Sequence, residues 1–194
     1  MTSPFFAYLY RLRFIRRWSL MRNTQPENVA EHTYYVALLT HALCEIGRVR
    51  FGKKVDAGGA VVLALFHDVE EVMTGDIPTP VKHHNQRLLR SLKEMEGEAG
   101  ERLLEMVPKE LSPVYQPLIR HSEGDAELGA WVKAADKLAA YLKCCVETAA
   151  GNREFAVAQK QLGKAVAQLR MPEVDYFLEH YASAFQQTLD EISD

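Results

Sequence analysis

The sequence has 194 residues, 47% of them hydrophobic, which predicts one compact domain over residues 1–194 with a substantial core rather than two domains. Lys and Arg total 23, Asp and Glu total 26, and the formal net charge is -3, without a basic run or tail. Polymeric nucleic acid is therefore not expected as a partner, because binding to a phosphate backbone depends on clustered cations.

The ends and cysteines of the chain predict a cytoplasmic protein with no membrane partner. The first residues lack a charged leader followed by an apolar segment, and no apolar run reaches the ~18 residues that a membrane span needs. Cys44 and the neighbours Cys144 and Cys145 do not have the spacing of a disulfide framework. We interpret them as free thiols in a reducing compartment.

Apolar residues recur with helical spacing along the chain, and alternating strand patterns are absent, so we predict an all-α fold, a helical bundle. A short helix over residues 4–12 precedes a loop over residues 16–26. Asn28 then caps a helix, and Glu31, three positions on, completes a capping box. His32 falls within the apolar stripe of this helix and is expected to point inward, whereas His41 points the other way.

The next helix is capped by Asp56, and its run over residues 60–66 is apolar on all sides, as expected at the centre of a bundle. The pair His67-Asp68 interrupts that run. Residues 74–80 contain two prolines and a glycine, which predict a fixed loop directly after the pair.

The second half of the sequence predicts further helices over residues 85–107, from Ser112, and over residues 125–150, 154–169 and 172–192. Asp136 lies within or beside the apolar face of the long helix over residues 125–150. Four other histidines are given no role: His83, His84, His121 and His180.

His32, His67, Asp68 and Asp136 place metal-competent groups on faces that should be buried. A single inward histidine is usually a hydrogen-bonded core residue, and a single inward aspartate is usually a cap or an ion-pair partner. All four together are hard to explain by packing, because buried carboxylates need compensation. One shared divalent cation with mixed nitrogen and oxygen ligands satisfies them all.

This H…HD…D pattern resembles the HD-domain metal-dependent phosphohydrolases. The surrounding text is more specific and is similar, essentially end to end, to the YfbR-like bacterial 5'-deoxynucleotidases. The segments that carry this resemblance are Phe5-Phe6-Ala7, Arg17-Trp18-Ser19-Leu20-Met21-Arg22, His67-Asp68-Val69-Glu70-Glu71, Gly75-Asp76-Ile77-Pro78-Thr79-Pro80, Tyr141-Leu142-Lys143-Cys144 and Leu189-Asp190-Glu191-Ile192.

The resemblance implies a homodimer that hydrolyses deoxyribonucleoside 5'-monophosphates to deoxyribonucleoside and phosphate through a metal-activated water. It implies one divalent cation per subunit, Co²⁺, Mn²⁺ or another transition metal. The implied ligands are His32, His67, Asp68 and Asp136, and His32 and Asp68 are also implied to contact substrate.

Three further residues receive roles from the resemblance. Arg17 is implied to orient the phosphate, a task that suits a planar guanidinium, although the residues alone would have placed it on the surface. Trp18 is implied to contact substrate; an ordinary core or lid aromatic is the alternative. Glu71 is implied to be the acid-base residue, and on a continuing helix it would return to the face of His67.

The resemblance also implies a substrate-binding loop formed by Asp76, Ile77, Pro78 and Thr79, with the Asp76 carboxylate able to accept a hydrogen bond from the 3'-hydroxyl. A plain turn capped by Asp76 is the alternative. Two other functions stay open: an HD-domain hydrolase of a deoxynucleoside triphosphate, cyclic nucleotide or alarmone, and a helical interaction module without catalysis.

Overall fold

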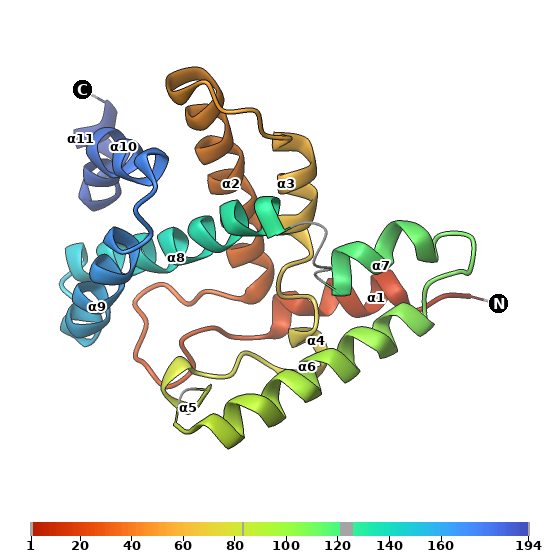
Figure 1. The fold of residues 1–194 in the computed structure, drawn as a ribbon. Coiled ribbons are helices and arrows are strands. Elements are labelled where there is room, and N and C mark those ends of the chain that lie inside the picture. The colour runs from red at the N-terminus through yellow and green to blue at the C-terminus, as the bar shows by residue number, and fades with distance from the viewer. Residues whose placement is uncertain (1, 83, 121–125, 194) are drawn as a thin grey trace. The chain divides into compact units, whose positions relative to one another are not determined.

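We describe residues 2–82, 84–120 and 126–193 of a computed structural model of the chain. Within these ranges the regular structure is helical and no strand forms, although Arg16 and Asn28 make an isolated antiparallel bridge (Figure 1). The prediction of an all-α fold is confirmed. His83, His121 and Asp125, the predicted first residue of the long helix, lie outside the described residues.

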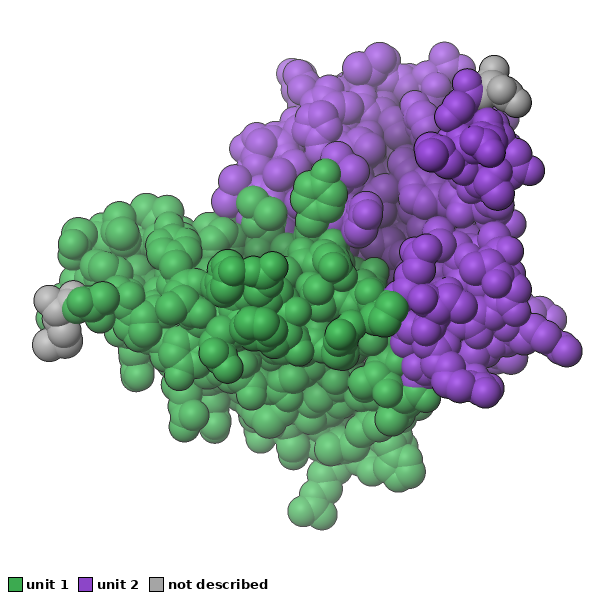
Figure 2. Space-filling view, turned by 180° about the vertical axis from the view of Figure 1, so that it is seen from behind, with its two compact units in different colours: residues 1–20, 26–34, 65–126 green, residues 21–25, 35–64, 127–194 purple. Residues whose placement is uncertain are grey.

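The chain divides into two compact units whose segments alternate along the sequence (Figure 2). Unit 1 comprises residues 1–20, 26–34 and 65–126, and unit 2 comprises residues 21–25, 35–64 and 127–194. The assignment of residues 1–194 to a single domain stays a prediction. In the described parts of both units, no helix combines the length and apolarity needed to cross a membrane.

Unit 1 is built mainly around the long amphipathic helix α6 and the short helices near it. Its elements are α1 (Phe5–Leu9), the 3₁₀ turn η1 (Tyr10–Phe14), the start of α2 (Val29–Phe51), α4 (Glu71–Thr74), α5 (Thr79–Lys82), α6 (Gln86–Glu105) and α7 (Ser112–Arg120). The buried core residues are Phe5, Leu12, Val29, Val69, Leu103, Leu104, Val107 and Ile119. This core joins α1, α6 and α7 to the segment that follows His67.

The start of α2 has the predicted capping box. The Glu31 backbone N–H donates to Asn28 Oδ1 at 3.0 Å, and the Asn28 N–H donates to a Glu31 carboxylate oxygen at 3.0 Å. These two bonds satisfy amide groups that a helix start leaves without intrahelical partners. They also fix where His32 lies, one turn into the helix.

The helix before His67 differs from its prediction in two ways. α3 (Ala57–Leu65) begins as expected, with Asp56 Oδ1 accepting from the Gly59 N–H at 3.0 Å. The prediction of burial on all sides is wrong, because Val62 is 42% exposed and Leu65 is 45% exposed. The helix also ends before His67, so the argument that Glu71 returns to the His67 face on a continuing helix is wrong.

Residues 66–70 form turns instead of continuing α3. The Val69 N–H donates to the Phe66 carbonyl at 3.4 Å, and the Glu71 N–H donates to the Asp68 carbonyl at 3.2 Å. These three-residue spacings are tighter than those of an α-helix. α4 then ends at Gly75, whose φ of 73° is open to glycine at little cost. The predicted loop is shorter than expected, because Thr79 and Pro80 already begin α5.

Unit 2 contains most of the longest helices. Its elements are most of α2, α3, α8 (Ala126–Ala149), the 3₁₀ turn η3 (Arg153–Phe155), α9 (Ala156–Ala167), α10 (Pro172–Tyr181), the 3₁₀ turn η4 (Ala182–Gln186) and α11 (Leu189–Ser193). Its buried apolar residues include Val36, Leu43, Cys44, Leu63, Leu138, Cys144, Cys145, Phe155 and Val174. None of the three cysteines forms a disulfide, as predicted, and the structure places all three in buried positions.

The prediction of one last helix to Ile192 is wrong, because α10 ends at Tyr181 and α11 begins only at Leu189. A second capping box explains the new start: the Thr188 N–H donates to Glu191 at 2.6 Å, and the Glu191 N–H donates to Thr188 Oγ1 at 3.4 Å.

Unit 2 holds the segment 21–25 against α8 through one buried carboxylate. Glu147 accepts hydrogen bonds from Thr24 Oγ1 at 2.6 Å, the Gln25 N–H at 3.1 Å and Asn152 Nδ2 at 2.7 Å. Lys143 Nζ lies 2.6 Å from the same carboxylate. Burial alone would raise the pKa of Glu147, but the hydrogen bonds from Lys143, Thr24 and Asn152 outweigh burial and lower it.

We expect Glu147→Gln to lower the free energy of unfolding at pH 7 by about 1.5–3 kcal/mol, the contribution of hydrogen bonds to a charged group. Because the folded pKa lies below the ordinary value of 4.5, the stabilisation is present above that pH and is lost as the pH falls toward the folded pKa. Denaturant unfolding of wild type and variant between pH 3 and pH 7 measures this difference. The matched control is Glu154→Gln, which removes a surface carboxylate paired with Arg22 at 2.7 Å. An equal loss of stability for Glu147→Gln at every pH would contradict the assignment.

Candidate metal and substrate site

Three of the four predicted metal ligands converge in unit 1. His32 is buried in the first turns of α2 with 1% of its surface exposed, and His67 and Asp68 follow one another in the turn after α3. Asp68 Oδ2 lies 3.7 Å from His32 Nε2 and 3.0 Å from His67 Nε2. One ligand atom of each residue lies within 4.8 Å of the others.

These residues fit a divalent cation. Imidazole nitrogen and carboxylate oxygen are ligands that Mn²⁺, Co²⁺, Zn²⁺ and Fe²⁺ accept together. Separations of 3.0 and 3.7 Å between ligand atoms suit one ion whose bonds are about 2.1 Å long. Burial would raise the pKa of Asp68, but the nearby His67, His32 and Arg17 lower it instead. The carboxylate is therefore ionised and ready to bind a cation.

Arg17 extends the cluster on the side of Asp68. Its Nη1 lies 3.7 Å from Asp68 Oδ2, and its side chain is only 12% exposed. Arg17 belongs to the loop predicted between η1 and α2, and the expectation from the residues alone, a surface arginine, is wrong. Trp18, the next residue, is half-buried and has a φ of 55°, a left-handed conformation that is uncommon for a bulky side chain.

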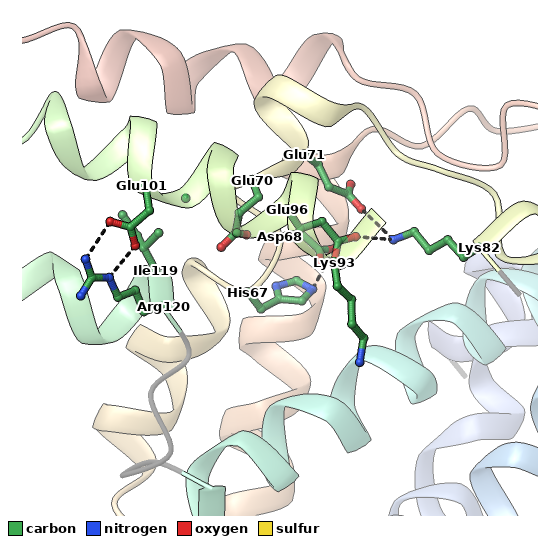
Figure 3. Close-up of a pocket in the computed structure, with 12 residues that line it drawn as sticks. His67, Asp68, Glu70, Glu71, Lys82, Lys93, Glu96, Glu101, Ile119 and Arg120 are labelled. Atoms are coloured by element: carbon green, nitrogen blue, oxygen red, sulfur yellow. Dashed lines mark hydrogen bonds and ion pairs between the residues drawn. The ribbon is translucent and has the colours of Figure 1, made fainter. Parts of the chain in front are cut away.

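A cavity of about 410 Å³ opens beside His67 and Asp68 within unit 1 (Figure 3). Its volume lies in the range of small-molecule sites. Its lining residues are His67, Asp68, Glu70, Glu71, Lys82, Lys93, Glu96, Gly97, Gly100, Glu101, Ile119 and Arg120. The cavity therefore joins the metal-competent cluster to the charged face of α6.

Glu71 points into this cavity although α3 does not continue to it (Figure 3). Its Oε1 lies 3.9 Å from Lys82 Nζ, and its buried Oε2 has no hydrogen-bond partner among the residues that the structure describes. Burial raises the pKa of Glu71 to about 8, and the charges of Asp68 and Asp76 add to this effect. At neutral pH its carboxyl group is mainly protonated.

The predicted substrate loop follows α4 directly. Asp76, Ile77 and Pro78 are half-buried, and Thr79 is exposed at the start of α5. Asp76 is near enough to Glu71 to raise its pKa, so this loop borders the same part of unit 1. Its contact with a substrate stays a prediction.

Asp136 lies in unit 2, on α8, half-buried beside the fully buried Ala135. Its role as the fourth ligand stays a prediction. In unit 1 the structure brings together Arg17, His32, His67 and Asp68, while Glu71 shares the cavity with His67 and Asp68.

Several charged residues beside the site were not predicted from the sequence. Glu27 accepts hydrogen bonds from Arg17 Nε at 3.0 Å and from Trp18 Nε1 at 3.2 Å. Lys82 Nζ lies 3.4 Å from Glu96 Oε1. Glu70 lines the cavity, and burial followed by the charges of Asp68 and Glu96 raises its pKa to about 7. Glu70 lies in the segment His67-Asp68-Val69-Glu70-Glu71 that carries the family resemblance, whereas Glu27, Lys82 and Glu96 lie outside every such segment.

The model of the 5'-deoxynucleotidase YfbR-like family matches residues 4–185. The chain belongs to this family. A 5'-deoxynucleotidase of Klebsiella pneumoniae (strain 342) is 47% identical over 191 residues, which cover 98% of this chain and 96% of the relative. The 5'-deoxynucleotidase YfbR of Shigella dysenteriae serotype 1 is 47% identical over 192 residues, with the same coverage of 98% and 96%.

Solved structures support the fold of this YfbR-like chain. An HD-domain phosphohydrolase from Listeria innocua has a TM-score of 0.81 at 25% identity and covers 97% of this chain and 91% of its own. The cyanophage S-2L HD phosphohydrolase DatZ, bound to dA and one catalytic Zn²⁺ ion, has a TM-score of 0.67 at 22% identity and covers 91% and 95%. The prediction of an HD-domain fold is confirmed.

We expect His67→Ala to weaken binding of Mn²⁺ or Co²⁺ at least about tenfold, because even the loss of an outer-shell partner of a metal ligand costs about 10–100-fold. Metal content after equilibrium dialysis, measured by mass spectrometry, tests this expectation. His41→Ala is the matched control, since His41 lies on α2 with an exposed side chain. Equal metal content in the two variants would exclude His67 as a ligand.

Proposed function

We propose that this chain hydrolyses deoxyribonucleoside 5'-monophosphates to deoxyribonucleoside and phosphate, with one divalent cation held by His32, His67, Asp68 and Asp136. The observation that carries the proposal is the convergence of two imidazoles and the Arg17 guanidinium on the single carboxylate of Asp68. A metal site beside an arginine is suited to a phosphate monoester, and relatives at 47% identity over nearly the whole chain are named 5'-deoxynucleotidases.

A bound cation supplies Lewis acidity there, lowering the pKa of a water molecule and polarising a phosphate oxygen. Arg17 orients the phosphate, because a guanidinium binds two phosphate oxygens at once. Its position 3.7 Å from Asp68 lets it reach a phosphate held against the ligand cluster. His32 and Asp68 also contact this phosphate.

Glu71 donates a proton to the 5'-oxygen of the leaving group. The departing 5'-oxygen is a poor leaving group unless a proton arrives as the bond breaks. Glu71 is mainly protonated at neutral pH, since its pKa is raised to about 8, and it faces the cavity shared with His67 and Asp68. These features support the role of general acid for Glu71, with Lys82 nearby to balance the carboxylate that remains.

The sugar and base contact Trp18 and the loop of Asp76, Ile77, Pro78 and Thr79. The Asp76 carboxylate accepts from the 3'-hydroxyl, while side chains near Trp18 and the loop exclude a 2'-hydroxyl by steric or polar contacts. A half-buried loop between two short helices supports this assignment, because it is held at both ends by α4 and α5.

The cation is Co²⁺, Mn²⁺ or another transition metal; the HD-domain phosphohydrolase DatZ holds one catalytic Zn²⁺ ion together with dA. We also propose a cytoplasmic homodimer that binds neither polymeric nucleic acid nor membranes. Three free thiols support a reducing compartment. Large apolar side chains that share one exposed face of α2, Tyr34, Tyr35 and Leu38, support an interface between subunits.

We expect purified protein to release phosphate from 5'-dNMPs in preference to 5'-NMPs, 3'-dNMPs and dNTPs, and EDTA to abolish this activity. Asp136→Ala should remove it as well, because one ligand of the cation is lost. Phosphate release with each substrate, before and after metal is restored, measures both effects. Chelator-insensitive activity, or full activity in Asp136→Ala, would contradict the metal mechanism. A preference for dNTPs, or no hydrolysis at all, would favour one of the two other functions.

Glu71→Gln should lower kcat about 10²–10⁴-fold while KM changes little, since the amide keeps the shape of the side chain but cannot supply a proton. Steady-state kinetics on a 5'-dNMP tests this. The control is Glu101→Gln, at the far end of the same cavity lining and paired with Arg120 at 2.6 Å. The assignment of Glu71 fails if both variants turn over like wild type.

A further inference from the structure

Glu27 contacts two residues of unit 1, Arg17 and Trp18, that are expected to contact the substrate. Its Oε2 accepts from Arg17 Nε at 3.0 Å and from Trp18 Nε1 at 3.2 Å. One oxygen atom therefore binds both neighbouring side chains. The side chain of Glu27 is 14% exposed, so water competes little for these hydrogen bonds.

The backbone places Glu27 opposite Arg17 independently of its side chain. The Arg17 N–H donates to the Glu27 carbonyl at 3.0 Å, and the Val29 N–H donates to the Ile15 carbonyl at 3.0 Å. The bridge between Arg16 and Asn28 lies between these bonds. Residues 15–17 and 27–29 thus run antiparallel, and the Glu27 side chain is directed to Arg17 and Trp18 by a fixed frame.

Trp18 needs a stabilising partner in this position. Its φ of 55° costs free energy for a residue with a Cβ, and such conformations persist only where the surroundings hold them. A carboxylate that accepts from the indole N–H is a charge-assisted hydrogen bond, about twice as strong as a neutral one.

The contact with Glu27 also fixes the orientation of the Arg17 guanidinium. Nε is occupied by Glu27, while Nη1 faces Asp68 at 3.7 Å. The guanidinium is planar, so fixing Nε fixes the direction of both Nη groups. Without Glu27, the guanidinium would be able to turn toward Asp68 and form an ion pair with the carboxylate oxygen that the cation needs as a ligand.

We propose that Glu27 is a positioning residue, whose carboxylate orients the Arg17 guanidinium and the Trp18 indole toward the substrate. The inference rests on the proposed function, because it takes Arg17 as the phosphate ligand and Trp18 as a contact of the nucleoside. Glu27 itself touches neither the substrate nor the cation; it acts through its two partners.

The test compares Glu27→Ala and Glu27→Gln with the matched control Glu154→Gln, which breaks the exposed pair with Arg22. Kinetics with dAMP give KM and kcat for each variant. A second readout uses a Trp131→Phe background, in which Trp18 is the single tryptophan of the chain, so its fluorescence anisotropy and emission wavelength report the indole alone.

We expect Glu27→Ala to raise KM about 10–100-fold, the range for residues that orient a ligand-binding group, with a smaller fall in kcat. Trp18 anisotropy should fall and its emission should move to the red. Glu27→Gln should keep most of the anisotropy, because its amide oxygen still accepts, and should raise KM less. In an Arg17→Ala background, Glu27→Ala should lower kcat/KM less than it does in wild type, because only the contact with Trp18 then remains to be lost. Glu154→Gln should match wild type in every readout.

Unchanged KM and unchanged Trp18 anisotropy in both Glu27 variants would overturn the proposal, as would additive losses with Arg17→Ala. If Glu27→Ala does not fold, Glu27→Gln decides alone, because it preserves the volume of the side chain. An inactive wild type would refute the proposed function, whereas an active wild type with indifferent Glu27 variants would refute only the positioning role.

Discussion

The charge balance around the Asp68 carboxylate is the constraint on which the site of unit 1 depends. Asp68 faces His32, His67 and Arg17 within 3.7 Å, and these neighbours keep it ionised despite burial. α3 ends at Leu65, and Asp68 lies in the turn that follows it. A continuing helix would rotate His67 and Asp68 about 100° apart around its axis, whereas the turn lets both side chains meet His32.

The segment of residues 27–31 has several structural roles. Residues 27–31 cap α2, form the bridge to Arg16 and bring the Glu27 carboxylate to Arg17 and Trp18, and His32 follows immediately. His32, proposed as a metal ligand, and Arg17, proposed to orient the phosphate, are therefore fixed by the same few hydrogen bonds. A displacement of this helix start would move both, which couples metal binding to phosphate binding without any direct contact between His32 and Arg17.

Features that depend on residues close together in the sequence, such as helix caps, could be predicted, whereas contacts between residues far apart in the sequence could not. The caps at Asn28 and Asp56 depend on residues three positions apart, and the sequence predicts both. The pair of Thr188 and Glu191 has the same spacing, and it begins a helix that was not predicted. The end of α3 could not be predicted, because residues 66–71 contain neither Gly nor Pro; the structure shows Val69 of this turn buried in the core of unit 1. Partners such as Thr24 and Glu147 are more than a hundred residues apart, and no single sequence reveals them.

The cavity of unit 1 contains more acid than base, which bears on how an anionic substrate enters. Asp68, Glu70, Glu71, Glu96 and Glu101 line it with Lys82, Lys93, Arg120 and His67. A phosphate dianion would be repelled by this lining unless some of the acids were neutral or a cation were present. The raised pKa values of Glu70 and Glu71, about 7 and about 8, remove part of the negative charge. If Asp68 holds a divalent cation as proposed, the cation and Arg17 would make the charge at the proposed phosphate position positive, so metal binding and substrate binding should be mutually favourable.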